Sequence, residues 1–556
     1  MRKRRGPEPL SATGDSRARA PQAEKAAGRR PGPRWLPVAL VLAGALLRIL
    51  YTWGTDVRNV YDDHFQVARI MLEQHRWPHP DDGWQCYQPP LYHALSALTY
   101  RVFSGHAQGP PPPQPSYEER SSGAGIQCCY PWHLAGRKAI QFISTVCGIG
   151  TLWLVWQALR TVFPGRIFAQ SLGVAFIAFL PRHIYMSGMA TNDAMTYLWA
   201  SLCFWAILRA VAHPSDAAAN DRAAARTPAR TLRNPAAPPR ARYGWWLLAG
   251  LGAALAMWTK HYGLSCPVVL FAALAATVLV RRRATQWGGA RGPLLGAAVA
   301  LTLGIWPYVR NFELTGDPVV SPFKRLPNNM ANQLPGELSK VSWASFRLGA
   351  LRAHPWLHIS TVDSFWTALY AELWFDYGTS TTAYQYRPWL EYVWPIWRDQ
   401  SISGRERERR GHIWDLGVMP PAMVPQARAL YLLGLLPAAL VVLGCVGIFR
   451  EAGGFVPSVV LLTALALGVA TPLFQTIRQP FRSSMKAAFA LHALVPLAVL
   501  LSTGCEFAAR WRYGRWLRWA LAVDLALLAI VAVWHFGYLS LVFPHTPEYF
   551  ARRDPL

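Results

Sequence analysis

The sequence predicts an all-α protein that crosses a membrane about eleven times. Hydrophobic residues make up 52% of the 556 residues and aromatic residues 13%, whereas charged residues contribute only 15%. A typical soluble domain carries about 25% charged residues. Apolar runs of the length of a membrane-spanning helix recur along the chain, and arginines gather between alternate runs. These observations together favour a polytopic membrane protein.

The apolar runs that we interpret as spans are each near the roughly 20 residues that a helix needs to cross the hydrocarbon layer. They lie at 35–53, 138–160, 166–187, 193–212, 243–260, 264–281, 292–310, 427–449, 455–474, 486–503 and 515–540. Residues 1–34 are rich in Arg, Pro, Ala and Gly, which predicts a disordered basic tail in the cytoplasm. The first run has no small-residue cleavage site after it, so we interpret it as an anchor.

Arginine placement sets the predicted orientation. With the N-terminus inside, the cytoplasmic segments would be 161–165, 213–242, 282–291, 450–454 and 504–514. Six arginines fall between residues 222 and 242, in agreement with the positive-inside rule. The segment 89–104 is apolar but short, and counting it as a span would reverse this agreement. We therefore expect it to form a helix at the outer membrane surface.

Two large regions are expected outside the cytoplasm, at 54–137 and 311–426, and C-terminal spans follow in 427–556. The Trp-rich stretch 364–378 is expected to form a second surface-lying helix. In the first region a disulfide from Cys86 to Cys128 or Cys129 would be compatible with an extracytoplasmic location. The other cysteines lie in or beside apolar runs, and the cysteines follow no metal-ligand spacing.

The formal net charge of +26 could suggest a nucleic-acid partner. Most of the cations, however, lie in short segments between apolar runs, where positive charge marks the cytoplasmic side of a membrane. We therefore expect membrane lipid as a partner and no nucleic acid.

Asp62 and Asp63 follow the first predicted span, and His64 comes next. One carboxylate could act as a general base on an acceptor hydroxyl or amine, or help to bind a divalent ion. His64 could share either role or be structural. The alternative is that one aspartate only caps the helix predicted to start at Phe65.

Asn192 and Asp193 close the hairpin between two predicted spans, on the same side as Asp63. An acid there could cap the following helix. It could also pair with Asp63 across a divalent metal site, and an acid at that depth is costly unless it has a partner.

Several cations are predicted on this outer side, against the positive-inside trend. They are Lys260, His261, Arg310, Arg478, Arg482 and Lys486. Such cations could hold a lipid phosphate or diphosphate. Each one singly could instead extend to lipid headgroups.

The order of these motifs resembles the GT-C fold integral-membrane glycosyltransferases, which include protein O-mannosyltransferases and lipid A aminoarabinose transferases. The resemblance covers roughly residues 35–320. The segments that carry it are Tyr-Asp-Asp-His at 61–64, Tyr-Gln-Pro-Pro-Leu-Tyr at 87–92, Thr-Asn-Asp at 191–193, Trp-Thr-Lys at 258–260, Trp-Pro-Tyr-Val-Arg-Asn at 306–311 and Gly-Asp-Pro at 316–318.

The resemblance implies a catalytic transmembrane module at 35–320 with its first extracytoplasmic loop at 54–137. It implies a polyprenyl-phosphate or dolichyl-phosphate sugar as donor, a glycan, lipid or protein as acceptor, and inversion at the anomeric carbon. By position, Asp62 or Asp63 would be the base and Asp193 a second acid that helps to place a metal or the acceptor. Gln88 would join the cations in binding donor phosphate or acceptor. The adjacency of Asp63 and His64 departs from the family's more usual spacing, which leaves the choice between Asp62 and Asp63 open.

Two other functions stay open. A secondary transporter or lipid flippase would predict broken helices and ionisable residues near the middle of the membrane. In the sequence, Asp524 is the only clear acid within a predicted span. A non-catalytic scaffold of the same fold would tolerate loss of Asp63.

The Arg, Ala and Pro bias favours a bacterial inner membrane or plasma membrane over the endoplasmic reticulum, with the active site on the extracytoplasmic face.

Overall fold

The computed structural model describes residues 33–55, 64–83, 85–104, 134–211, 239–281, 290–320, 342–355, 364–375, 423–451, 454–478 and 485–542. Among these residues the regular structure is helical, and the β-structure is an isolated bridge between Ser342 and Ser364. The predicted all-α class is confirmed.

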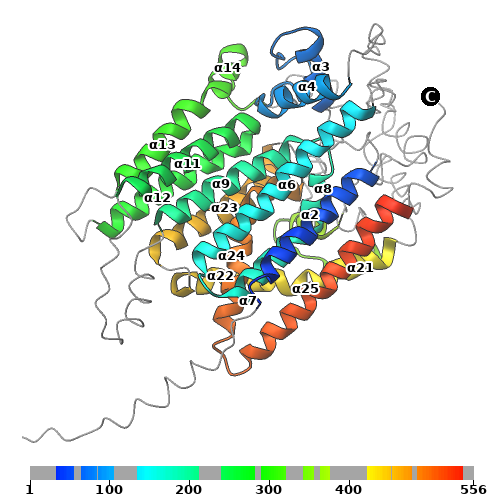
Figure 1. The fold of residues 1–556 in the computed structure, drawn as a ribbon, viewed down its shortest axis with the longest axis vertical. Coiled ribbons are helices and arrows are strands. Elements are labelled where there is room, and N and C mark those ends of the chain that lie inside the picture. Colours follow the sequence, from blue (N-terminus) through cyan, green and yellow to red (C-terminus); the bar gives the residue numbers. More distant parts are fainter. Residues whose placement is uncertain are drawn as a thin grey trace, which may run out of the picture.

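Long helices run side by side and form the bundle in Figure 1. In chain order they are α2 (Leu36–Gly54), α6 (Leu134–Val162), α7 (Ile167–Ala178), α9 (Asn192–Val211), α11 (Pro239–Thr259), α12 (Ser265–Arg281), α13 (Arg291–Gly304), α21 (Met423–Leu433), α22 (Leu435–Glu451), α23 (Phe455–Arg478), α24 (Leu494–Ala508) and α25 (Gly514–Gly537). Shorter elements complete the described chain: α3 (His64–Glu73), α4 (Leu91–Ser104), α8 (Pro181–Ser187), η1 (His261–Leu264), α14 (Trp306–Thr315), α16 (Leu348–Ala353), α18 (Phe365–Trp374), η8 (Ala487–Ala493) and η9 (Tyr538–Val542).

Eight of the described helices are long and apolar enough to cross a membrane, or up to ten if each of two bent pairs is one span. These ten coincide with ten of the eleven predicted runs. The remaining run, 243–260, lies in α11, which is not among the helices long and apolar enough to cross a membrane. The chain is therefore a multi-pass membrane protein, as the sequence predicts.

Both bent spans break next to a proline. Helices α7 and α8 meet at 58°, and α13 and α14 at 43°. Pro181 begins α8 and Pro307 lies in the first turn of α14. Proline has no N–H for the preceding turn and disfavours the helical conformation at the residue before it. Leu180, which precedes Pro181, is accordingly extended, with ψ 113°.

Arg48 of α2 stabilises the break after α7. Its guanidinium is fully buried and donates to the carbonyls of Gly44 (2.8 Å), Ala178 (2.9 Å) and Ile177 (3.2 Å). Helix ends leave carbonyls without intrahelical donors and carry partial negative charge. A buried cation is therefore compensated here by the carboxyl end of a helix, and Arg48 also lies 2.7 Å from His183 Nδ1.

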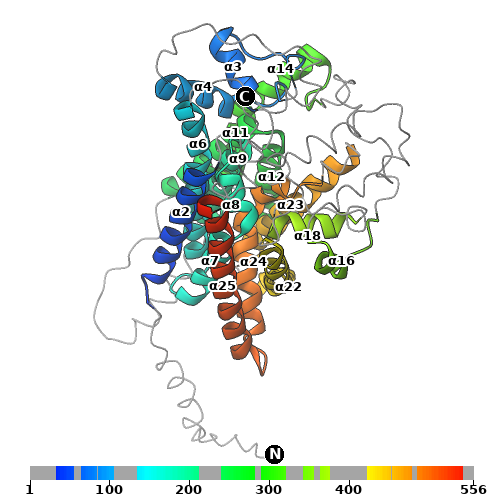
Figure 2. The ribbon, with the colours of Figure 1, turned by 90° about the vertical axis from the view of Figure 1, so that its right-hand side faces the viewer.

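The end of the bundle that carries α3, α4 and α14 holds the first predicted extracytoplasmic region (Figures 1 and 2). Helix α4 has 14 residues and is not among the helices able to cross a membrane, in agreement with the expectation for 89–104. Helix α18 is more enclosed than a surface-lying helix. Most of its residues are buried, and Glu372 pairs with Arg182 of α8 at 2.6 Å.

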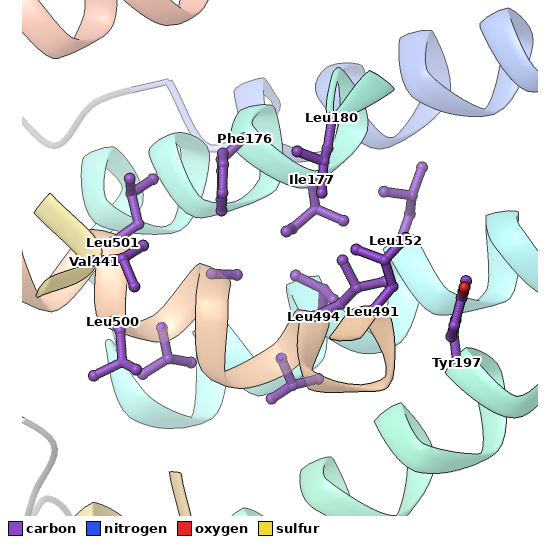
Figure 3. Packing of buried hydrophobic residues seen from close by; sticks show 14 of the residues in the cluster. Leu152, Phe176, Ile177, Leu180, Tyr197, Val441, Leu491, Leu494, Leu500 and Leu501 are labelled. Carbon is purple, nitrogen blue, oxygen red and sulfur yellow. The ribbon is translucent and has the colours of Figure 1, made fainter. Parts of the chain in front are cut away.

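Part of the apolar core lies where α24 packs against α6, α7 and α22 (Figure 3). Helices α22 and α24 approach most closely at two glycines. A Cβ built on Gly504 would lie 2.0 Å from the carbonyl oxygen of Leu440, and one on Gly444 would lie 2.0 Å from that of Leu500. Small residues allow this backbone contact, which drives helix association within lipid.

Replacing Gly504 with alanine should separate α22 from α24, because the obstructing atom is a backbone carbonyl. We expect Gly504→Ala to lower the free energy of unfolding by about 1–3 kcal/mol, measured by thermal unfolding in detergent. Gly537→Ala is the matched control, since a Cβ there meets no atom within 4 Å. Equal stability of the two variants would contradict the close approach.

Candidate functional site

The site is built around Asp193, in the first turn of α9. The carboxylate is fully buried, and its Oδ2 accepts a hydrogen bond from Thr191 Oγ1 at 2.8 Å. The Asp193 N–H returns a bond to the same hydroxyl at 3.3 Å. Neighbouring Asn192 donates to the carbonyl of Thr259 at 3.2 Å. The predicted Thr-Asn-Asp motif therefore fixes the start of α9 against the end of α11.

Lys260 is the charge partner of Asp193. It lies in extended conformation between α11 and η1, and its Nζ is 2.7 Å from Asp193 Oδ2. Tyr262 donates its hydroxyl to Asp193 Oδ1. Both charges of the pair are buried, and removing one partner of such a pair typically costs about 3–5 kcal/mol.

Aromatic rings from η8 close the other side of this pair. The Tyr262 ring stacks on His492, with centroids 5.3 Å apart and an interplanar angle of 25°. The Lys260 ammonium lies 5.5 Å from the ring centroids of both Tyr262 and Phe489, within the range of a cation–π interaction. Lys486 immediately precedes η8.

His64 of α3 and His93 of α4 form a buried pair. Their Nδ1 and Nε2 atoms are 3.0 Å apart, so one ring donates and the other accepts. Burial lowers the pKa of His64 to about 3, and the charge of Lys260 contributes to this shift. The pKa of His93 lies well below its ordinary value, first through burial and then through His64. Both rings are therefore neutral at neutral pH.

The charges of Lys260, Asp193 and Lys486 all act on His64. Phe65, next to His64, packs in one buried cluster with Ala194, next to Asp193, and η8, which Lys486 precedes, packs on α9. The structure thus brings together four of the predicted site residues, His64, Asp193, Lys260 and Lys486. His64 directly follows Asp63 in the chain. Asp62, Asp63 and Arg482 lie outside the described residues, so their predicted roles stay predictions.

The remaining predicted residues lie where the first extracytoplasmic region meets α14. His261 lies against Tyr87 and Tyr308, with ring centroids 5.4 Å and 5.8 Å away. Gln88 donates to the Tyr87 hydroxyl at 3.1 Å. Arg310 donates to the carbonyl of Pro78 at 2.6 Å.

Arg478 pairs with Asp317 of the predicted Gly-Asp-Pro motif at 2.7 Å. The contacts of Arg310 and Arg478 are thus with the protein's own chain and tie the outer segments together. Cys86 is buried, and Cys128 and Cys129 lie outside the described residues, so the predicted disulfide is untested.

Sequence reasoning missed Tyr262, His93 and His492. Tyr262 stands two residues after Lys260, and His93 directly follows the Tyr-Gln-Pro-Pro-Leu-Tyr motif, so sequence position offered a signal for these two. His492 lies in an apolar segment, with no comparable signal.

The predicted metal site consists of Asp63 and Asp193, of which the structure describes Asp193. The surroundings of Asp193 do not suit a divalent metal. Asp193 already accepts from Lys260, Thr191 and Tyr262, and the ammonium would repel a second cation on the same oxygen. Within the described ranges, no group of three His, Cys, Asp or Glu residues could hold a metal ion. The contribution of Asp63 stays a prediction.

Comparison with known proteins finds similar solved structures, whereas no family model and no curated protein matches the sequence. An oligosaccharyltransferase from Archaeoglobus fulgidus, in complex with Zn and sulfate, matches with a TM-score of 0.46 and 15% identity over 90% of this chain and 53% of that chain. The oligosaccharyltransferase AglB of the same organism, with an inhibitory peptide and a dolichol-phosphate, matches with a TM-score of 0.44 and 12% identity over 91% and 56%.

ArnT from Cupriavidus metallidurans, bound to undecaprenyl phosphate, matches with a TM-score of 0.35 and 15% identity over 85% of this chain and 78% of that chain. The present chain spans about half the length of the archaeal structures. The solved structures that match thus include an oligosaccharyltransferase and ArnT, all at TM-scores below 0.5.

The histidine pair predicts a pH dependence of stability. Unfolded His64 binds a proton below about pH 6.5, whereas the buried ring stays neutral down to a pKa of about 3. The unfolded state therefore binds more protons in this window, and stability is lost as pH falls below 6.5, by up to about 1.4 kcal/mol per pH unit for this group.

His64→Asn retains a hydrogen-bonding atom near the Nδ1 position and removes the titrating ring. We expect its melting temperature to fall less between pH 7 and pH 5 than that of the unsubstituted protein. His79→Asn is the control, because the His79 side chain is 39% exposed. An unchanged pH slope in His64→Asn would contradict the neutral buried ring.

Proposed function

We propose that this protein is a glycosyltransferase that moves a sugar from a polyprenyl-phosphate-linked donor to an acceptor at the membrane surface. The observation that carries the proposal is the buried cluster of Asp193, Lys260 and Tyr262 beside His64. This cluster gathers three of the motifs on which the sequence resemblance rests, although the motifs lie far apart in the chain.

The general base is proposed to be Asp63 or Asp62, with the choice still open. Asp193 is less suited to this role because three donors occupy its oxygens and no part of it is exposed. Asp193 is better assigned as a positioning residue that holds the Lys260 ammonium and the Tyr262 hydroxyl.

In the proposed reaction the base takes the proton from the acceptor hydroxyl or amine. The acceptor atom attacks the anomeric carbon, the bond from that carbon to the phosphate oxygen breaks, and the lipid phosphate leaves with the electron pair. One displacement inverts the anomeric configuration. Fixed cations at the leaving oxygen stabilise its developing charge.

Among the described residues, Lys260 and Lys486 are the cations that we assign to the leaving phosphate oxygen. An ammonium carries three N–H donors, and Asp193 accepts one of those of Lys260. The others are able to meet a phosphate oxygen. His64 and His93, both neutral, add hydrogen-bonding capacity without adding charge.

The active site is proposed to face away from the cytoplasm. Arg166, which flanks the predicted cytoplasmic segment 161–165, and Arg510, which lies within 504–514, both pair with Glu451 at the end of α22. Arg166 follows the carboxyl end of α6, whereas the start of α6 packs against α4 at the other end of the bundle. This charge placement supports the predicted orientation. A bacterial inner membrane or plasma membrane remains the favoured location.

A secondary transporter or flippase is the second candidate, and specific observations favour it. The structure has broken helices and buried Arg48, Arg182 and Glu372, which are features expected of a transporter. In this structure, however, Arg48 caps the end of α7 and Arg182 pairs with Glu372. These groups thus have fixed structural partners, and the glycosyltransferase is preferred.

Transfer of labelled sugar from a panel of polyprenyl-phosphate sugars by purified protein tests the proposal. Loss of the general base typically costs about 10²–10⁴-fold in rate, so Asp62→Asn or Asp63→Asn should lower turnover by that amount in protein that stays folded. Asp193→Asn should also lose most activity, with loss of stability.

Asp81→Asn is the matched control from the same region, since its side chain is 47% exposed and lies 3.4 Å from His79 Nδ1. Full turnover in both Asp62→Asn and Asp63→Asn would overturn the assignment of the base. Absence of turnover and of donor-induced thermal stabilisation across the panel would favour the transporter or scaffold.

A further inference from the structure

Asp524 is an acid in the middle of the last spanning helix. It lies ten residues after Gly514 and thirteen before Gly537, the two ends of α25. At 1.5 Å per residue, it is about 15 Å from the start of the helix. The whole stretch Trp516–Val542 is long and apolar enough to cross a membrane, so Asp524 lies at the depth of the lipid hydrocarbon.

Among the residues that the structure describes, none forms a hydrogen bond or ion pair with the Asp524 side chain, although Tyr370 of α18 lies within electrostatic reach of it. The Asp524 Oδ2 is shielded from solvent and makes no hydrogen bond. Intramembrane acids are costly and are almost always paired with another group. The other charged groups deep in the bundle obey this rule, since Arg48 meets carbonyls and Arg182 meets Glu372.

Asp524 lies at the border between the buried face and the exposed face of α25. Leu521 and Leu528 on the same helix are buried, whereas Val523 and Leu527 are exposed. Asp524 is intermediate between these two faces. Helix α25 lies at the right-hand edge of the bundle in Figure 1 and at its front in Figure 2, where that side faces the viewer. Its outward face continues through exposed Ile530, which makes an apolar surface with one carboxylate at its margin.

We propose that this outward face of α25 docks a transmembrane helix of another protein that carries a lysine or arginine within its apolar stretch. The apolar side chains would pack against that helix, and the cation would satisfy the carboxylate. Charge complementarity selects this occupant over a second copy of this chain. Among the described residues, the arginines deep within the spans, Arg48 and Arg182, are buried inside the bundle, so a second copy presents neither of them to the lipid.

The test uses the full-length protein in lipid vesicles and a synthetic Leu/Ala transmembrane peptide with one central lysine. The comparison peptide has leucine at that position, and association is measured by energy transfer between labels. We expect the lysine peptide to bind about tenfold more tightly than the leucine peptide, the size of one interhelical polar contact in lipid. Asp524→Asn and Asp524→Leu should both abolish this preference.

Leu527→Asn is the matched control, because it places a polar group on the same exposed face and leaves the carboxylate in position. It should keep the preference for lysine. Equal binding of the two peptides, or a preference that survives in Asp524→Leu, would overturn the proposal. Two further results would also overturn it: a large fall in melting temperature in Asp524→Leu, which indicates a partner within the chain, and self-association that depends on Asp524, which indicates a second copy.

Discussion

The candidate site depends on the buried ion pair between Asp193 and Lys260. It joins the start of α9 to the end of α11, and through Tyr262, Phe489 and the cation–π contacts it reaches η8. Three segments far apart in the sequence are held at one end of the bundle by this pair. The desolvation of both charges makes each dependent on the other. Loss of either would leave a charge in an apolar setting.

The same constraint applies at the break between α7 and α8, which Pro181 introduces. A buried charge in lipid needs a partner, and the break between α7 and α8 exposes the helix carbonyls that Arg48 uses. Helix α8 also presents Arg182 to Glu372 and Tyr185 to His535 Nε2 at 3.2 Å. His535 in turn lies 2.7 Å from Gln426 through Nδ1. A short segment of α8 therefore fastens α2, α18, α21 and α25 together.

Much of the fold could be predicted from local sequence, because the length of an apolar run is a local property. That α4 is too short to cross a membrane follows from the length of its apolar run. The sequence predicts one continuous span at 166–187, because hydrophobicity continues across Pro181. The structure instead bends there by 58°. Helix α18 was expected at the surface from its aromatic residues, yet the pairing of Glu372 with Arg182 encloses it. That contact spans 190 residues of chain and has no local signature.

The sequence predicted the residues of the candidate site better than the contacts between them. Asp193, Lys260 and His64 were each singled out, and the structure places them together. The sequence suggested Asp63 and a metal as the partners of Asp193, whereas the observed partners are Lys260, Thr191 and Tyr262. The pairing of His64 with His93 depends on how α3 packs on α4, which periodicity within either helix does not specify.

A double-mutant cycle on Asp193 and Lys260 tests the central claim most directly. The free energy of unfolding would be measured for Asp193→Asn, Lys260→Met and the double variant. Each single change should destabilise by about 3–5 kcal/mol, and the double variant should recover part of that loss, with a coupling of about 1–3 kcal/mol. Additive effects of the two changes would contradict a buried, mutually dependent pair.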